Sequence, residues 1–241
     1  MVALAGCGSS APHVKPLAFH GISAYLVTPS GGGTHPAVVL VHGSGGDRSE
    51  LLSQAKQLAK RGIVALTITA PSSSPAARPT TMHALLAEAR RAQEADVAAV
   101  EAAVATLKET PGVDGTRLGY LGWSAGAKTG TFVARDFRAA ALLSAGAASV
   151  DQFVAAAPAG SRAEVRRVLT QIDPVRAIGR ARPGSILLED GRRDEIVLQE
   201  ALRNVIRAAP PRTTVRWYDA PHALNDRAWA DARSWLYDRL Q

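Results

Sequence analysis

The pentapeptide Gly122–Gly126, with Ser124 at its centre, is the segment of this chain best suited to chemistry. It follows the largely apolar run 117–121, which predicts a strand, and the residues from Ala125 onward predict a helix. Two glycines allow a turn so tight that the serine between them takes strained backbone geometry, with its hydroxyl exposed at the tip of the strand. This nucleophile-elbow pattern predicts that Ser124 can attack a carbonyl carbon.

A base and an acid that orients it are expected near such a serine. His222 lies in a loop just after the last predicted strand, Thr213–Tyr218, and Asp194 follows the predicted strand Ser185–Leu188 through a short turn. Catalytic groups of open α/β sheets gather at the carboxyl ends of strands. We therefore predict His222 as the base of Ser124 and Asp194 as its orienting acid.

Each of these residues also has an alternative interpretation. Glu189 and Asp190 lie only a few residues before Asp194, and a shift of the strand end would exchange their roles. His222 could instead cap a helix or lie on the surface near Asn225, and the serine could be a small turn residue.

Donors for a developing oxyanion are predicted from the segment His42–Gly46, which reads His-Gly-Ser-Gly-Gly and directly follows the apolar strand Ala37–Val41. Glycines there let the backbone turn its amides toward a pocket. We predict the backbone amides of Ser44 and Ala125 as the two donors, the second at the N-terminus of a helix, where the dipole favours negative charge. His42 itself is predicted to be structural.

Alternating strands and helices predict a single α/β domain. Expected strands are 17–28, as one or two strands, and the segments 37–41, 63–68, 116–121, 139–144, 185–188 and 213–218. Expected helices are 50–61, 82–108, one from Ala125, one from Glu195 and one over 226–240. Continuous apolar strands suit a parallel sheet covered on both faces, so we predict a doubly wound, mostly parallel sheet.

A short helical insertion is predicted after the sixth strand, over Ala147–Pro183, where the alternating pattern weakens. It could form a small cap, or ordinary crossover helices without a gating role. Phe153 within it, and Trp123 beside the serine, are predicted to line the substrate pocket, although a core role is equally compatible with both.

These motifs together resemble those of the α/β-hydrolase superfamily, and within it the dienelactone-hydrolase-like and acetylxylan-esterase-like branch. The chain order Ser124, Asp194, His222 matches that superfamily, and the resemblance spans about residues 18–240. Dienelactone hydrolases proper use cysteine at the elbow, so the resemblance with serine here favours an ordinary serine esterase. It implies a carboxylic-ester hydrolase that forms an acyl-enzyme on a small or short-acyl ester.

The same residue types would also serve a thioesterase, an acyltransferase or a small peptidase. From a different class of function, a non-catalytic, envelope-tethered binding domain on a hydrolase scaffold is the remaining alternative. No metal-ligand spacing, Walker A segment or dinucleotide fingerprint is found, so we expect no metal and no cofactor.

Composition predicts one globular domain of 241 residues. The net charge is +7, from 28 basic and 21 acidic residues, but the arginines are scattered among alanines without dense basic runs. We therefore expect a small-molecule ester as partner and no nucleic acid, while attraction to an anionic membrane surface stays open. No pattern indicates an oligomeric state.

The single cysteine, Cys7, ends the segment Leu4–Cys7, which resembles a bacterial lipobox. Only three residues precede this segment, so a lipoprotein signal would need an upstream start, and a chance match is the alternative. We predict a flexible N-terminus over 1–16 with this lipidation site and tether, followed by the hydrolase domain over 17–241. The protein is then expected in the cell envelope as a lipoprotein, or otherwise in the cytoplasm.

Overall fold

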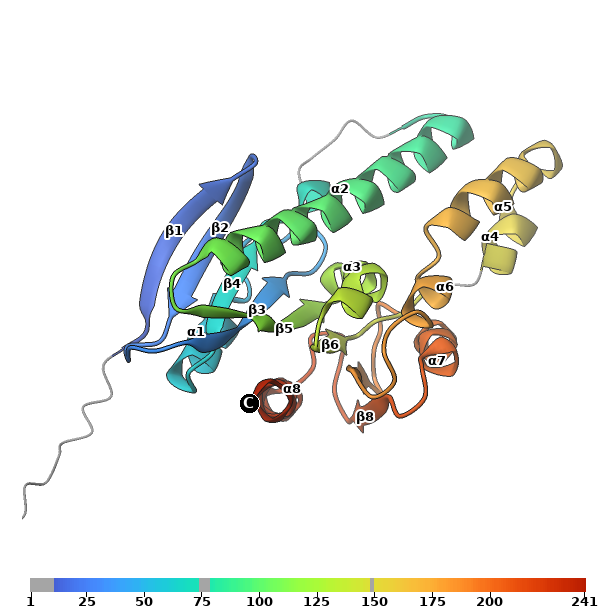
Figure 1. Ribbon diagram of the computed structural model, residues 1–241. Coiled ribbons are helices and arrows are strands. Elements are labelled where there is room, and N and C mark those ends of the chain that lie inside the picture. The colour runs from blue at the N-terminus through green and yellow to red at the C-terminus, as the bar shows by residue number, and fades with distance from the viewer. Residues whose placement is uncertain (1–10, 74–78, 148–149) are drawn as a thin grey trace, which may run out of the picture.

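A single eight-stranded sheet forms the centre of the computed structural model, which describes residues 11–73, 79–147 and 150–241 (Figure 1). Across the sheet the strands are β1 (His13–Phe19), β2 (Ile22–Thr28), β4 (Val64–Ile68), β3 (His35–Val41), β5 (Val113–Trp123), β6 (Ala139–Leu143), β7 (Ile186–Gly191) and β8 (Thr214–Tyr218). β2 pairs antiparallel with β1 and with β4, and all other neighbours are parallel. The predicted mostly parallel sheet is thus confirmed.

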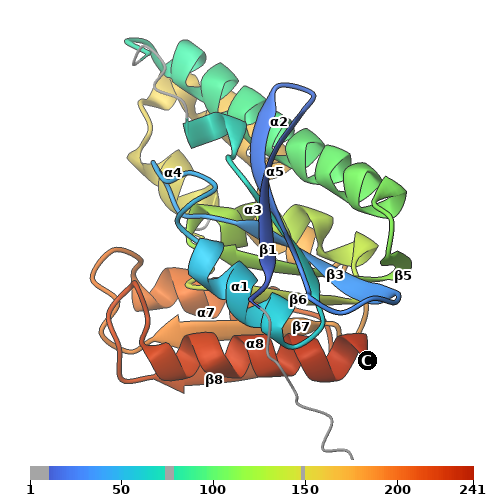
Figure 2. The same cartoon turned by 90° about the vertical axis from the view of Figure 1, so that its left-hand side faces the viewer.

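Helices cover both faces of the sheet because the side chains of each central strand alternate between two buried clusters. In β3, Val38 and Leu40 join a cluster with residues of α1 (Leu52–Lys60) and α8 (Asp226–Leu240). Val39 and Val41 join the opposite cluster, whose helices are α2 (Met82–Glu109), α3 (Ala125–Val133), α6 (Pro174–Ile178) and α7 (Gln199–Ala208). Figures 1 and 2 show α1 and α8 on one side of the sheet and α2 and α3 on the other.

The sheet topology determines where the strand ends meet. From β3 the chain passes to β4 on one side and later to β5 on the other, so the connections leave in opposite directions at this point. Such a switch point opens a crevice at the carboxyl ends of the strands. The predicted oxyanion loop and the predicted serine both lie there, because the loop directly follows β3 and the serine directly follows β5.

The predicted helical insertion after the sixth strand is present between β6 and β7. It consists of α4 (Val150–Ala156), the short 3₁₀ helix η3 (Ala159–Ser161), α5 (Arg162–Gln171) and α6. The other short helices are η1 (Pro71–Ser73) and η2 (Ala134–Asp136). Apolar side chains of α4 and α5 form a small third cluster with Leu86 near the start of α2. Within the insertion, α4 and α5 are therefore supported by α2, whereas Ile178 of α6 belongs to a cluster that covers the sheet.

Two sequence-based expectations differ from the structure. The domain begins earlier than residue 17, because β1 starts at His13 and pairs over its whole length with β2. The helix expected from Glu195 begins only at Gln199. Asp194 accepts hydrogen bonds from the amides of Ile196 and Val197, and these bonds hold the intervening residues in a turn.

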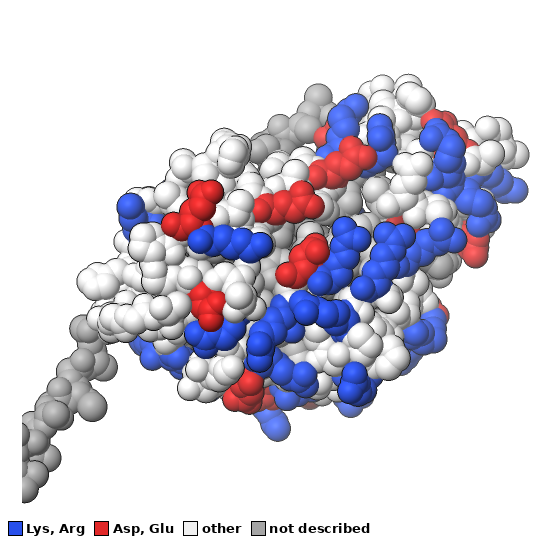
Figure 3. All heavy atoms as spheres, viewed as in Figure 1, with Lys and Arg blue, Asp and Glu red and all other residues white. Residues whose placement is uncertain are grey.

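Charged side chains of both signs share the face seen in Figure 3. Several arginines pair with acidic neighbours, for example Arg166 with Asp151 and Arg207 with Glu200, each at 2.7 Å. Part of the positive charge of the chain is thus neutralised locally. Among the described helices, none has the length and apolar character needed to cross a bilayer.

Candidate active site

Ser124 lies in the turn between β5 and α3, in a backbone conformation that side chains rarely adopt, with φ 54° and ψ −113°. Close contacts explain the flanking glycines. A β-carbon on Gly122 would lie 2.5 Å from the carbonyl oxygen of Gly126, and one on Gly126 would lie 2.1 Å from the carbonyl oxygen of Val41. The turn can close in this form only with glycine at both positions, which keeps the serine in its strained conformation.

His222 connects Ser124 to Asp194. Its Nε2 lies 2.9 Å from Ser124 Oγ, and its Nδ1 lies 2.8 Å from Asp194 Oδ2. The side chains of the histidine and the aspartate are 10% and 0% exposed. With the aspartate ionised, Nδ1 carries the proton and donates a hydrogen bond to the carboxylate. Nε2 is then free to accept a hydrogen bond from the serine hydroxyl. The three predicted residues are therefore brought together in one hydrogen-bonded row.

The carbonyl oxygen of His222 is held by two side chains. Trp123 Nε1 donates to this oxygen at 3.1 Å, and Ser144 Oγ donates to the same oxygen at 2.9 Å. The Trp123 ring also lies 5.5 Å from the imidazole, measured between centroids. Trp123, predicted to bind substrate, thus contacts the histidine loop. Ser144 was not singled out by the sequence, where it is only a polar residue at the end of an apolar strand.

Asp194 is the acid that reaches the imidazole, and the alternatives Glu189 and Asp190 do not. Asp194 Oδ1 accepts from the amides of Ile196 and Val197 at 2.9 and 2.8 Å, so its orientation is fixed. Both alternatives are buried in β7. Burial raises the pKa of Asp190 to about 7, and the negative charge of Asp194 adds to this.

Glu189 has a different set of neighbours. Its Oε1 accepts from Tyr218 Oη at 2.9 Å and from Arg216 at 3.3 Å. Burial raises the pKa of Glu189 to about 7 although both of these contacts lower it. Among the described residues, Glu189 Oε2 and Asp190 Oδ1 have no hydrogen-bond partner. These two carboxyl groups lie beneath the reactive row and take no part in it.

Two backbone amides near Ser124 have no hydrogen-bond acceptor among the described residues. Within the described part of the chain, the amides of Ser44 and Ala125 donate to no other group, whereas those of Gly43 and Gly126 are occupied. Gly43 N donates to Glu50 Oε2 at 3.0 Å, and Gly126 N donates to the carbonyl of His42 at 3.0 Å. Two amides at the predicted positions are thus available to a developing negative charge.

The loop that carries Ser44 is anchored by His42, which is 2% exposed. His42 Nε2 accepts from the amide of Ala70 at 3.0 Å, so the proton lies on Nδ1, which donates to the carbonyl of Gly43 at 2.6 Å. The histidine therefore ties the end of β3 to the segment after β4. This arrangement agrees with the structural role expected for it.

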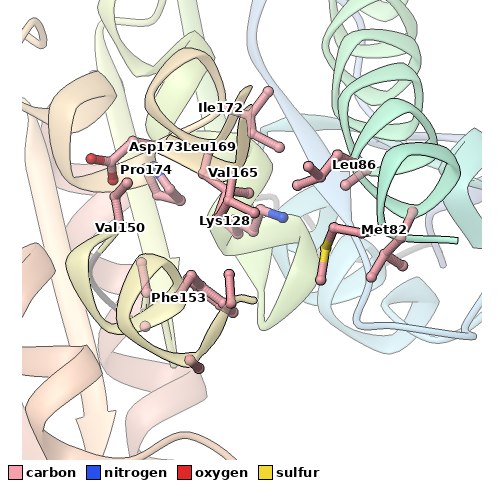
Figure 4. A pocket seen from close by; sticks show the side chains of 16 residues that line it. Met82, Leu86, Lys128, Val150, Phe153, Val165, Leu169, Ile172, Asp173 and Pro174 are labelled. Atoms are coloured by element: carbon pink, nitrogen blue, oxygen red, sulfur yellow. The ribbon is translucent and has the colours of Figure 1, made fainter. Parts of the chain in front are cut away.

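A largely apolar pocket lies between α2, α4 and α5, above α3, and has a volume of about 490 Å³ (Figure 4). Of the two residues predicted to line the substrate pocket, Phe153 lies in the wall of this pocket and Trp123 does not. Leu85 and Phe153 are each 51% exposed, although both are large apolar residues. Lys128, on α3 four residues after Ser124, is the only basic residue among the described residues of the wall.

Cys7 and the segment that resembles a lipobox lie outside the described residues. No group of three or more His, Cys, Asp or Glu residues in the described ranges has a geometry that could hold a metal ion.

Comparison with known protein families shows to which family this chain belongs. A model of the dienelactone hydrolase family matches residues 22–235. The chain belongs to the dienelactone hydrolase family. Membership makes it a hydrolase, of the carboxylesterase-like serine hydrolase class. No curated protein sequence matches this family member.

Solved structures with the same fold include several esterases. Acetyl xylan esterase 1 from a Thermoanaerobacterium species has a TM-score of 0.74 at 14% identity, over 95% of this chain and 88% of that one. An acetyl xylan esterase from a Paenibacillus species has a TM-score of 0.73 at 17% identity, over 95% and 89%. A cold-adapted esterase from an Arctic intertidal metagenomic library has a TM-score of 0.69 at 20% identity, over 95% and 94%. At these identities the likeness shows the shared fold of this dienelactone hydrolase family member.

Proposed function

We propose that this protein hydrolyses carboxylic esters through Ser124, His222 and Asp194, by way of an acyl-enzyme. The observation that carries the proposal is the hydrogen-bonded row from Asp194 through His222 to Ser124, with distances of 2.8 and 2.9 Å. A serine hydroxyl is a weak nucleophile until a base takes its proton. The row supplies that base and an acid that holds it in the required tautomer.

The first half-reaction forms the acyl-enzyme. His222 Nε2 removes the proton of Ser124, whose oxygen attacks the ester carbonyl carbon, and the carbonyl oxygen becomes an oxyanion. The free amides of Ser44 and Ala125 stabilise that charge. The tetrahedral intermediate then expels the alcohol, which takes the proton from His222, while Asp194 stays ionised and stabilises the imidazolium.

The second half-reaction releases the acid. His222 removes a proton from water, the resulting hydroxide attacks the acyl carbonyl, and Ser124 leaves with the proton that the imidazole returns. Both tetrahedral intermediates use the same two amides. A small or short-acyl ester, the substrate indicated by the sequence, is part of this proposal.

A fluorophosphonate probe tests the nucleophile, because it phosphonylates only activated serines. We expect one adduct per chain, located at Ser124 by mass spectrometry, and no adduct in the Ser124→Ala variant. Ser30→Ala is the matched control, since it removes an exposed hydroxyl just after β2 and should still be labelled at Ser124. A folded wild-type protein without an adduct would contradict the proposal and favour a non-catalytic binding domain.

A further inference from the structure

Lys128 differs from every other residue around the 490 Å³ pocket because it brings a positive charge to an otherwise largely apolar wall. The pocket is lined from α2 by Met82 and Leu86 and from α4 and α5 mainly by aliphatic residues and Phe153. Figure 4 shows the amino end of Lys128 directed toward the space between Met82 and Leu86. The charge therefore borders the cavity and does not extend along the outer surface.

The ammonium group of Lys128 has no hydrogen bond and no ion pair with any described residue. Two carboxylates are in the neighbourhood. Asp96 on α2 attracts the ammonium only at longer range, and its oxygens already accept from the backbone amide and the hydroxyl of Ser72 at 2.9 and 2.7 Å. Asp173 lines another side of the pocket and caps α6 through the amide of Val175. The lysine thus lacks a close anionic partner among the residues that the structure describes.

An unpaired ammonium group at the edge of an apolar cavity carries a free-energy cost. Burial lowers the pKa of Lys128, and the charge of Asp96 only partly opposes this. Long lysine side chains usually extend until the ammonium reaches water. Here the ammonium faces an apolar cavity instead, where a bound anion would both neutralise it and accept its hydrogen bonds.

We propose that this pocket binds an amphipathic carboxylate, whose apolar body lies among the side chains of α2, α4 and α5 and whose carboxylate pairs with Lys128. A single ammonium supplies one point charge, which suits one carboxylate better than a phosphate dianion. The volume lies within the usual range for small-molecule sites, about 300–1,000 Å³. Leu85 and Phe153 provide an apolar entrance.

The carboxylate can have two sources. It is either a free carboxylic acid or the far end of an ester substrate, and the second source rests on the function proposed for Ser124. Ser124 precedes α3 as its N-cap, and its carbonyl oxygen accepts from the amide of Lys128 at 2.9 Å, so the backbones of the two residues are about one turn apart, roughly 5–6 Å. In an ester bound at Ser124, a carboxylate separated from the ester carbonyl carbon by about four methylene groups would therefore reach Lys128.

Binding of octanoate to the Ser124→Ala variant tests the site without any catalysis. We expect octanoate to bind this variant at least fivefold more tightly than 1-octanol does, and Lys128→Met in the same background to weaken octanoate about tenfold to a hundredfold while leaving octanol within twofold. Lys108→Met is the matched control, because this exposed lysine lies at the far end of α2. Equal affinity for octanoate and octanol would overturn the proposal even if Lys128→Met failed to fold.

Hydrolysis of two matched esters distinguishes the sources. The 4-nitrophenyl half-ester of adipic acid and 4-nitrophenyl heptanoate have acyl groups of similar length, and only the first ends in a carboxylate. If the ester is the source, wild-type kcat/KM favours the half-ester at least fivefold and Lys128→Met removes the preference. Octanoate binding without this preference indicates the free acid as source. Octanoate binding without hydrolysis of either ester retains the pocket and rejects the proposed function.

Discussion

The reactive row and the apolar pocket are neighbours on α3, yet they are built in different ways. Around Ser124 nearly every position is fixed by the backbone, through the contacts of Gly126, the amides that hold Asp194 and the bonds to the carbonyl of His222. The pocket is instead formed by side chains of helices that are distant in the sequence, and its single basic group has no close partner. The comparison teaches that the reactive groups are positioned by strand ends and turns, whereas the shape of the pocket is determined by the side chains of helices.

The largest expected effect comes from Asp194→Asn, which keeps the shape of the row and removes its charge. An asparagine amide would donate toward His222 and favour the tautomer with the proton on Nε2, so that the imidazole could no longer accept from Ser124. We expect kcat to fall about 10³- to 10⁴-fold for a neutral aryl ester. Asp219→Asn, an exposed residue, is the control. If Asp194→Asn kept a tenth of the wild-type activity, the reaction would not depend on the fixed arrangement of these three side chains.

Removal of one backbone amide should have the next largest effect. Ser44→Pro deletes the free N–H, and loss of one oxyanion donor costs about 10²- to 10³-fold in kcat. Ser44→Ala retains the amide and should lose far less. Circular dichroism checks that both variants are folded. Similar losses in the two variants would show that the side chain of Ser44, and not its amide, is what the reaction uses.

Asp190 is an exception within the otherwise well-partnered region, because one of its oxygens has no partner. Its pKa is raised from 3.8 to about 7, so the folded state binds a proton that the unfolded state releases. The contribution of Asp190 protonation to the stability of the folded state is complete below about pH 4 and is lost as the pH rises through 7. Asp190→Asn should therefore raise the free energy of unfolding at pH 8 by on the order of 2–4 kcal/mol and have little effect at pH 4.

Urea denaturation at the two pH values measures this difference. A variant that is no more stable than wild type at pH 8 would contradict the raised pKa. Because the Asp190 carboxyl lies next to Asp194, the variant also shows whether a second negative charge in this region affects the reaction.

The smallest effect is expected from Phe153→Ala at the entrance of the pocket. Half of this side chain is exposed already, so its removal should leave the melting temperature nearly unchanged. We expect KM for 4-nitrophenyl heptanoate to rise about threefold to tenfold with kcat within twofold, since the ring supplies binding that is equal in the ground and transition states. Leu198→Ala, also exposed and apolar but outside the pocket, should leave KM unchanged. A loss in kcat alone would contradict this division between the two regions.

The same division explains what the sequence could predict. Ser124, Asp194 and the loop at Ser44 lie directly after strands within short glycine-containing segments, so local pattern and chain order were enough to bring them together. The expected helix is present, but its predicted start at Glu195 was wrong because the side chain of Asp194 accepts from the next amides, a competition that apolar periodicity does not reveal. Ser144 and the position of Lys128 depend on contacts between distant segments, and no local pattern indicates them.

The close approach of Gly126 to Val41 has a consequence for how this enzyme can acquire new substrates. With α3 pressed directly against the end of β3, mutation has no room to enlarge the space around the nucleophile by shifting that helix. Variation in the residues of α4, α5 and the first turns of α2 leaves this contact intact. A library for directed evolution is therefore best confined to those three helices, where altered side chains change selectivity without disturbing the reactive groups.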